Sequence, residues 1–226
     1  MENNYNQNHV RAKTLDLEYD LYTIKDIDSH VMRAAEKGKE WETFLCEKIK
    51  TLNLKEGSVC LDIGAYIGSH TIPMAKLGAE VFCWEPISVP FNLLKHNILI
   101  NNLEDRIYYY NCGLGDICES KTCRTSYTGT SSLNRNLSEY KYAEVINIHK
   151  LDQHLFDSVD FIKIDVEGYE WKVLEGGHKT IEKHRPVIAL ESFNTTKNKS
   201  NIKEFCKKYQ YHCEKLKSTD YWLTPI

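Results

Sequence analysis

The stretch Val59-Cys60-Leu61-Asp62-Ile63-Gly64-Ala65-Tyr66-Ile67-Gly68 has the pattern of a short buried strand that leads directly into a glycine turn. A helix start is expected next, near Ser69-His70-Thr71. This strand–turn–helix order is how an open α/β sheet forms a nucleotide-shaped crevice. Glycine allows a tight turn with positive φ and lets a ligand approach the backbone. Ordinary turn glycines give the same pattern, so these letters alone leave both interpretations open.

An acidic residue follows the next expected strand. Residues 80–84 are mostly apolar and end at Glu85-Pro86, about 20 residues beyond the glycine turn. An acid at this position can accept hydrogen bonds from both ribose hydroxyls. The turn reads Asp-x-Gly-x-x-x-Gly and lacks the paired glycines that seat a pyrophosphate on a helix N-terminus. An adenosine ligand without phosphates fits better, and S-adenosylmethionine is such a ligand.

A third informative stretch is Asp160-Phe161-Ile162-Lys163-Ile164-Asp165-Val166-Glu167-Gly168-Tyr169-Glu170. Phe161, Ile162 and Ile164 are typical of a central parallel strand that is apolar on both faces. Asp165 and Glu167 then come at the carboxyl end of that strand, where α/β sheets bind ligands. Lys163, inside so apolar a strand, requires a buried partner or a route to solvent.

Composition limits the classes of protein that the chain can belong to. Its 226 residues suffice for one sizeable α/β domain with a short extension, and 42% apolar with 27% charged residues is ordinary globular composition. The net charge of −3 gives no electrostatic drive toward nucleic acid. A nucleic-acid partner is therefore not favoured.

Cysteine usage and hydropathy indicate the compartment. The eight cysteines contain no Cys-x-x-Cys and no zinc spacing, so no metal site is predicted. The N-terminus is polar, and no apolar run is long enough to cross a bilayer. We expect a cytoplasmic protein with free thiols and no membrane partner.

The chain is expected to form a single domain behind a short arm. Residues 1–27 are assigned to an N-terminal arm that is partly disordered, with the Asn-rich first ten residues unstructured. Residues 28–226 are assigned to the domain, with leading helices over 28–54 and the core over 58–226. Ser29 is a plausible first cap, and Gly38 divides the helical pattern.

The segment 116–143 differs from the rest because it shows no clear periodicity. Its polar part, Thr128-Gly129-Thr130-Ser131-Ser132-Leu133, is either a functional loop or a mobile hairpin. Together with the leading helices, the loop from Cys118 to Tyr142 is expected to shape the acceptor pocket.

The three motifs together resemble the FkbM family of S-adenosylmethionine-dependent methyltransferases. The resemblance covers approximately Val59 to Ser192, and Lys-Ile-Asp-Val-Glu-Gly at 163–168 is its most specific part. Tyr66 stands where the family usually has a small polar residue. The resemblance implies an α/β class I methyltransferase fold, Rossmann-like, with a seven-stranded, mostly parallel sheet, an antiparallel last strand and helices on both faces. It also implies O-methylation of a hydroxyl on a small molecule, sugar or glycan.

The resemblance assigns roles by position. The methionine end of the cofactor would be held by the glycine turn, the ribose by Glu85, and the adenine would lie near residues 111–113. The residues expected to bind S-adenosylmethionine are Asp62, Gly64, Ala65, Tyr66, Gly68, Glu85, Pro86, Asn111, Cys112, Gly113 and Asp165.

A hydroxyl acceptor also requires a base to remove its proton. Asp165 and Glu167 are the leading catalytic residues, and Glu191, His70 and His154 are weaker alternatives. Asp165 could equally bind the cofactor amino group or cap the next helix.

Other functions are compatible with the same crevice. A nucleic-acid methyltransferase, acting for example on RNA ribose, would show a basic face and salt-sensitive RNA binding. A non-catalytic module would bind the cofactor without releasing product. A nicotinamide dehydrogenase is disfavoured because Gly-x-Gly-x-x-Gly is missing from the sequence.

Overall fold

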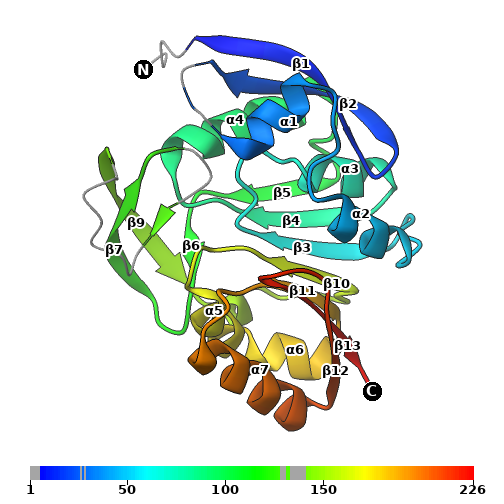
Figure 1. The fold of residues 1–226 in the computed structure, drawn as a ribbon, viewed down its shortest axis with the longest axis vertical. Coiled ribbons are helices and arrows are strands. Elements are labelled where there is room, and N and C mark those ends of the chain that lie inside the picture. The colour runs from blue at the N-terminus through cyan, green and yellow to red at the C-terminus, as the bar shows by residue number, and fades with distance from the viewer. Residues whose placement is uncertain (1–5, 26, 28, 128–130, 133–140) are drawn as a thin grey trace.

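The computed structural model describes residues 6–25, 27, 29–127, 131–132 and 141–226. Its centre is a seven-stranded sheet in the order β12-β13-β11-β10-β3-β4-β5 (Figure 1). Neighbours from β5 to β11 run parallel, and β13 is antiparallel to both β11 and β12. The strands are β3 (Val59–Ile63), β4 (Glu80–Trp84), β5 (Ile107–Tyr110), β10 (Phe161–Ile164), β11 (Val187–Glu191), β12 (Tyr211–Lys215) and β13 (Asp220–Pro225). The predicted fold class is confirmed.

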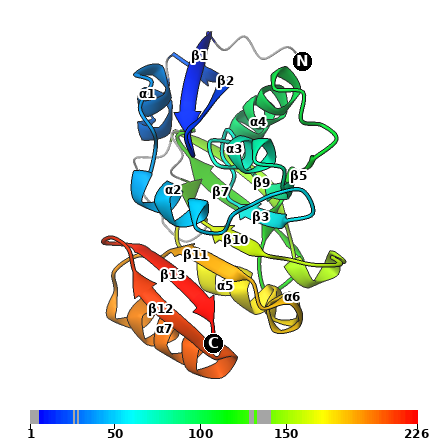
Figure 2. The ribbon, with the colours of Figure 1, turned by 90° about the vertical axis from the view of Figure 1, so that its right-hand side faces the viewer.

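Helices cover both faces of this sheet (Figure 2). Alternate residues of a strand point to opposite faces. In β3, Cys60 belongs to one apolar cluster and Leu61 to the other. The first cluster contains residues of α1 (His30–Glu36), α2 (Thr43–Lys50), α3 (Thr71–Lys76) and α4 (Ser88–Ile100). The second contains residues of α5 (Glu170–Gly176), α6 (His178–His184) and α7 (Thr196–Tyr209).

The leading helices are divided where the sequence indicates. Ser29 precedes α1, and its side chain makes no capping hydrogen bond. Gly38 lies between α1 and α2 with φ of +60°, a conformation that glycine adopts without steric cost.

The N-terminal segment forms an antiparallel hairpin of β1 (Gln7–Thr14) and β2 (Leu17–Ile24). The expectation that the first ten residues are unstructured is wrong for residues 7–10. Buried Asn97 of α4 accepts a hydrogen bond from the Tyr22 amide (2.6 Å) and donates one to the Ile67 carbonyl (2.9 Å). The hairpin is therefore tied to the glycine turn through an amide side chain.

A second, four-stranded sheet lies in the order β6-β9-β7-β8. Its strands are β6 (Gly113–Leu114), β7 (Glu119–Thr125), β8 (Ser131–Ser132) and β9 (Tyr142–His149), and a 3-10 turn, η1 (Leu151–Gln153), follows. The segment 116–143 was predicted to be irregular, and β7 corrects this, since strand pairing with β9 supplies its backbone with partners. Residues 128–130 and 133–140, most of the predicted polar loop, lie outside the described residues.

Among the described residues, the helices all lack the combination of length and apolar composition that crossing a membrane requires.

Candidate functional site

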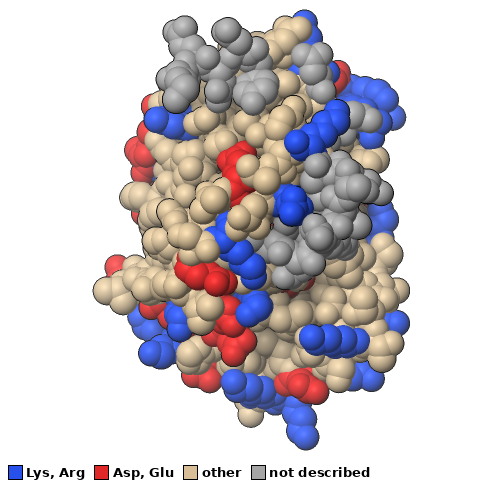
Figure 3. All heavy atoms as spheres, turned by 90° about the vertical axis from the view of Figure 1, so that its left-hand side faces the viewer, with Lys and Arg blue, Asp and Glu red and all other residues tan. Residues whose placement is uncertain are grey.

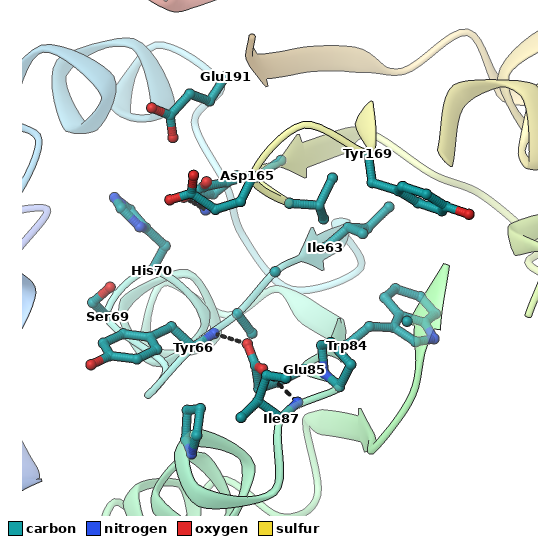
Figure 4. Close-up of a pocket in the computed structure, with 18 of the residues that line it drawn as sticks. Ile63, Tyr66, Ser69, His70, Trp84, Glu85, Ile87, Asp165, Tyr169 and Glu191 are labelled. Atoms are coloured by element: carbon teal, nitrogen blue, oxygen red, sulfur yellow. Dashed lines mark hydrogen bonds and ion pairs between the residues drawn. The ribbon is translucent and has the colours of Figure 1, made fainter. Parts of the chain in front are cut away.

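A cavity of about 250 Å³ lies at the carboxyl ends of β3, β4 and β10 (Figure 4). The strand ends form its floor. Cys123 and Ile146 of the second sheet line one side together with Tyr127, which follows β7, and α1 with the loop before α2 lines another. The residues from α1 and this loop are His30, Val31, Trp41 and Glu42. The cavity is thus enclosed by elements from three separate parts of the chain.

Glu85 forms one end of the cavity and is held by backbone hydrogen bonds. Its side chain is 6% exposed, and its two oxygens accept from the amides of Tyr66 (3.0 Å) and Ile87 (2.8 Å) (Figure 4). Burial raises the pKa of Glu85 to about 8, although both hydrogen bonds oppose the shift. A carboxylate has about four lone-pair sites, so capacity remains for further donors.

Apolar and small residues surround this Glu85 end. They are Trp84, Pro86, Ile87, Pro90, Cys112, Gly113 and Leu114. At Gly113 an added Cβ would have no atom closer than 3.6 Å. A ligand beside Glu85 would therefore meet mainly small and apolar groups.

The glycine turn is determined by contacts within the protein. Gly64 has φ of +87°, and a Cβ there would lie 1.8 Å from the Asp165 carbonyl oxygen. Gly68 has φ of +93°, and a Cβ there would lie 2.9 Å from Leu94. Contacts within the protein therefore require glycine at both positions, and Gly64 also lines the cavity.

Tyr66 links the glycine turn to the second sheet. Its φ is +53°, which few non-glycine residues adopt, and its amide binds Glu85. Its hydroxyl donates to the Tyr127 carbonyl, at 2.9 Å. The large side chain at this position bridges two walls of the cavity.

Lys163 is buried beneath the opposite end of the cavity. Its side chain is 6% exposed, and Nζ lies 3.2 Å from Asp165 Oδ2 and 3.7 Å from Asp62 Oδ1. Burial alone would lower its pKa, but the carboxylates of Asp165, Asp62 and Glu42 outweigh burial and raise it. Burial would likewise raise the pKa of Asp165, but Lys163, a side-chain hydrogen bond with Glu191 and the nearby His70 together outweigh burial, so this pKa is lowered. Asp165 is therefore ionised at neutral pH.

Four acids gather at this end, and we call Glu42, Asp165, Glu191 and Asp220 the carboxylate cluster. Burial and nearby carboxylates raise the pKa of Glu42 to about 7 and that of Glu191 to about 9. His70 lies beside the cluster, and its Nε2 is 3.6 Å from Glu42 Oε2. Burial lowers the pKa of His70 to about 3, so its imidazole is neutral.

The cavity brings together most of the residues that the sequence analysis selected. Asp165 and Glu167, the proposed catalytic pair, both line it, as do the alternatives Glu191 and His70. The other predicted residues that line it are Gly64, Ala65, Tyr66, Glu85, Pro86, Cys112 and Gly113.

Four selected residues lie outside the cavity lining. Asp62 is 1% exposed, and its carboxylate accepts from the Thr71 hydroxyl (2.6 Å) and faces Lys163. Gly68 packs against Leu94. Exposed Asn111 donates to the backbone oxygens of Glu85 and Pro86. His154 packs edge-on against Trp84, with ring centroids 5.2 Å apart.

Several lining residues were not selected from the sequence. Trp41 and Glu42 lie between two short helices in a segment rich in charged residues, and no local pattern distinguishes them. Asp220 belongs to the carboxylate cluster without lining this cavity; it begins the last strand and carries no motif. Lys163 did carry a signal, because a lysine in an apolar strand needs a partner.

Most of the chain matches a known protein family. Residues 62–218 match the family model described as the methyltransferase FkbM domain. No curated protein sequence matches the chain.

Similar folds are found among solved structures. The methyltransferase FkbM from Methylobacillus flagellatus KT is 20% identical with a TM-score of 0.55, over 74% of this chain and 43% of that one. A 16S rRNA methyltransferase of T. Thermophilus, solved with AdoMet and guanosine, is 16% identical with a TM-score of 0.57, over 97% and 51% of the two chains. A Pyrococcus abyssi tRNA methyltransferase, solved with S-adenosyl-L-homocysteine, is 14% identical with a TM-score of 0.50, over 95% and 43%. The present chain thus spans about half of these relatives or less, and at these identities the likeness shows the fold alone.

Proposed function

The chain belongs to the FkbM methyltransferase family, and we propose that it transfers a methyl group from S-adenosylmethionine to a hydroxyl of a phosphate-free small molecule, sugar or glycan. One observation carries the choice of acceptor. Lys163 is the only lysine or arginine among the described residues that line the cavity, and it is already paired with Asp165 and Asp62. A phosphate group would meet carboxylates here and no free cation.

The residues at the Glu85 end fit the adenosine part of the methyl donor. Glu85 retains acceptor capacity for ribose hydroxyls beside the two amides that it already binds. Cys112, Gly113 and Leu114 offer small and apolar contacts to an adenine ring. The methionine part would extend past Gly64 and Ala65 toward Asp165. Asp62 and Gly68 are covered by other residues and would act indirectly. Gly68 would fix the glycine turn, and Asp62 would hold Lys163 in place.

The carboxylates supply the acid–base chemistry that a hydroxyl acceptor needs. When bound, the sulfonium of the donor supplies an electrophilic methyl carbon and a neutral leaving group. Asp165, ionised and held by Lys163, can take the proton that the hydroxyl loses as its oxygen bonds to the methyl carbon. Glu167 lines the same cavity and is the second proposed base. The main task of the protein is to position the two reactants.

Charge on the surface also supports a phosphate-free acceptor. On the face shown in Figure 3, the lysines and arginines of the described residues are interspersed with aspartates and glutamates and form no continuous basic field. All eight cysteines are free thiols, which supports the proposed cytoplasmic setting.

Donor binding is tested first, by calorimetric titration with S-adenosylmethionine, S-adenosylhomocysteine and NAD. We expect micromolar binding of the first two and none of NAD. Binding of NAD alone would exclude methyl transfer.

Acceptor class is then tested by release of S-adenosylhomocysteine from wild type and Asp165→Asn. Sugars and small hydroxyl compounds are compared with RNA at low and high salt. Wild type should methylate sugars or small hydroxyl compounds. Asp165→Asn should still bind the donor but lose turnover. Asp116→Asn, which removes a carboxylate outside the cavity, is the control. Salt-sensitive turnover on RNA would instead support the nucleic-acid alternative, and donor binding without any turnover would support a non-catalytic module.

A further inference from the structure

Three carboxylates converge between the cavity and the C-terminal hairpin. Glu42 comes from the loop before α2, Glu191 ends β11 and Asp220 begins β13. One carboxylate oxygen from each lies within 4.8 Å of the others. They also line a second, smaller cavity that shares Glu42, Lys163, Asp165 and Glu191 with the first. Three oxygen donors therefore surround one small space.

This arrangement crowds three acidic side chains into one place. Glu191 and Asp220 face each other directly in the antiparallel pair of β11 and β13. Like charges directly opposite on neighbouring strands are destabilising. Among the described residues, no lysine or arginine forms an ion pair with Glu42, Glu191 or Asp220, since Lys163 is engaged by Asp62 and Asp165. Thr219 donates weakly to both hairpin acids, at 3.4 Å.

A buried imidazole points into the same place. His70 is 3% exposed, and its Nε2 has no hydrogen-bond partner. That atom faces Glu42 Oε2 at 3.6 Å, too far for a hydrogen bond (Figure 4 shows His70 directed toward Asp165). A buried polar atom without a partner in a native fold indicates a bound water or ion. His70 is thus a second sign of a ligand, independent of the acids.

We propose that Glu42, Glu191 and Asp220 bind one divalent cation of the hard, oxygen-preferring class, Mg²⁺ or Mn²⁺, with His70 facing it. Carboxylates are the ligands that these ions prefer. Because Glu42 and Glu191 also line the main cavity, the ion lies where an acceptor hydroxyl would enter, a consequence that rests on the proposed function.

The binding itself is tested without donor or acceptor, so its outcome is independent of methyl transfer. The full-length protein is stripped with a chelator and titrated with Mn²⁺, and free Mn²⁺ is followed by electron paramagnetic resonance. Wild type should bind one Mn²⁺ per chain. Glu191→Gln and Asp220→Asn should each weaken the dissociation constant at least tenfold.

Glu214→Gln is the matched control. It removes one carboxylate from the same C-terminal hairpin, and Glu214 pairs with Lys48 outside the cluster. This variant should bind Mn²⁺ as wild type does.

A second readout separates lost binding from lost folding. Mn²⁺ should raise the melting temperature of wild type and Glu214→Gln but not that of the two cluster variants. No saturable binding by the folded wild type at millimolar Mn²⁺ would overturn the proposal. Equal affinity in the folded Glu191→Gln and Asp220→Asn variants would overturn it as well.

Discussion

The two ends of the cavity hold buried carboxylates in opposite ways. At the Glu85 end, each oxygen of one carboxylate accepts a backbone amide that the local chain supplies. In the carboxylate cluster, four acids from distant elements face one another, and within the described part of the chain Lys163 is the one cation paired with them. At the first end the folded chain fixes both oxygens of the carboxylate and leaves them capacity for further donors, whereas at the second end the acids crowd around one lysine. The comparison teaches that the Glu85 end is preorganised by the chain, whereas the charge at the opposite end depends on what binds there.

Gly64 joins the two ends, and its substitution should have the largest effect. Gly64→Ala places a Cβ 1.8 Å from the Asp165 carbonyl oxygen, at a φ of +87°. Because backbone atoms cannot move aside cheaply, we expect the free energy of unfolding to fall by about 4 kcal/mol or more. Donor binding should be lost with it. Chemical denaturation and calorimetric titration measure both effects.

Gly113→Ala is the control for this substitution. Gly113 also lines the cavity, but its new Cβ would meet only side-chain atoms, the nearest at 3.6 Å. The expected loss is below about 1 kcal/mol. Equal losses in the two variants would show that the contact between Gly64 and Asp165 does not hold the two ends together.

Lys163→Met tests the carboxylate cluster and should have the next largest effect. The substitution leaves Asp62 and Asp165 without their cation, and Asp62 is 1% exposed. Breaking a buried pair by removing one partner typically costs about 3–5 kcal/mol. Chemical denaturation at neutral pH measures the loss.

Lys172→Met provides the comparison on the surface. Lys172 pairs with Asp116 at 2.7 Å, but its side chain is 42% exposed. An exposed pair contributes at most about 1 kcal/mol. If Lys163→Met lowered the free energy of unfolding no more than Lys172→Met does, Lys163 would not be needed to stabilise the carboxylate cluster.

The pH dependence of stability tests the Glu85 end and should show the smallest effect. Burial raises the pKa of Glu85 to about 8, from an ordinary value of 4.5. Between these values the folded protein holds a proton that the unfolded chain has released. The contribution of Glu85 to stability is therefore full below pH 4.5 and is lost as the pH rises through 8.

Glu85→Gln removes this titration. The fall in melting temperature from about pH 6 to about pH 9 should be smaller than in wild type, by about 5–10 °C, which corresponds to about 2–3 kcal/mol for a chain of this size. Asp116→Asn should leave the slope of wild type unchanged over this range, because Lys172 lowers the pKa of Asp116. A slope in Glu85→Gln identical to that of wild type would mean that Glu85 is already ionised in the folded protein.

Local signals explain which parts of the site could be predicted. The strand at 59–63, the acid after residue 84 and the acids after residue 164 each depend on a short run of residues. Parallel strands bring their carboxyl ends to one edge of the sheet, so residues that follow them meet there. Glu85, Asp165 and Glu167 do line one cavity for this reason.

The predictions from sequence were wrong for two segments whose strand partners lie elsewhere in the chain. The Asn-rich residues 7–10 form a strand because they pair with β2, which lies against α4. Residues 119–125 form a strand because β9 pairs with them. Neither segment has a strong pattern of its own, so strand pairing decided their conformation.

The sequence by itself determined the α/β sheet, the family and the strand-end acids, because these follow from apolar runs and short motifs. Only the tertiary structure decided that Glu42, Glu191 and Asp220 converge and that His70 faces them. It also showed that Asp165 and Leu94 leave no space for a side chain at Gly64 and Gly68. The physical reason is that charge crowding and close backbone contacts depend on distances between residues far apart in the chain, which no local pattern encodes.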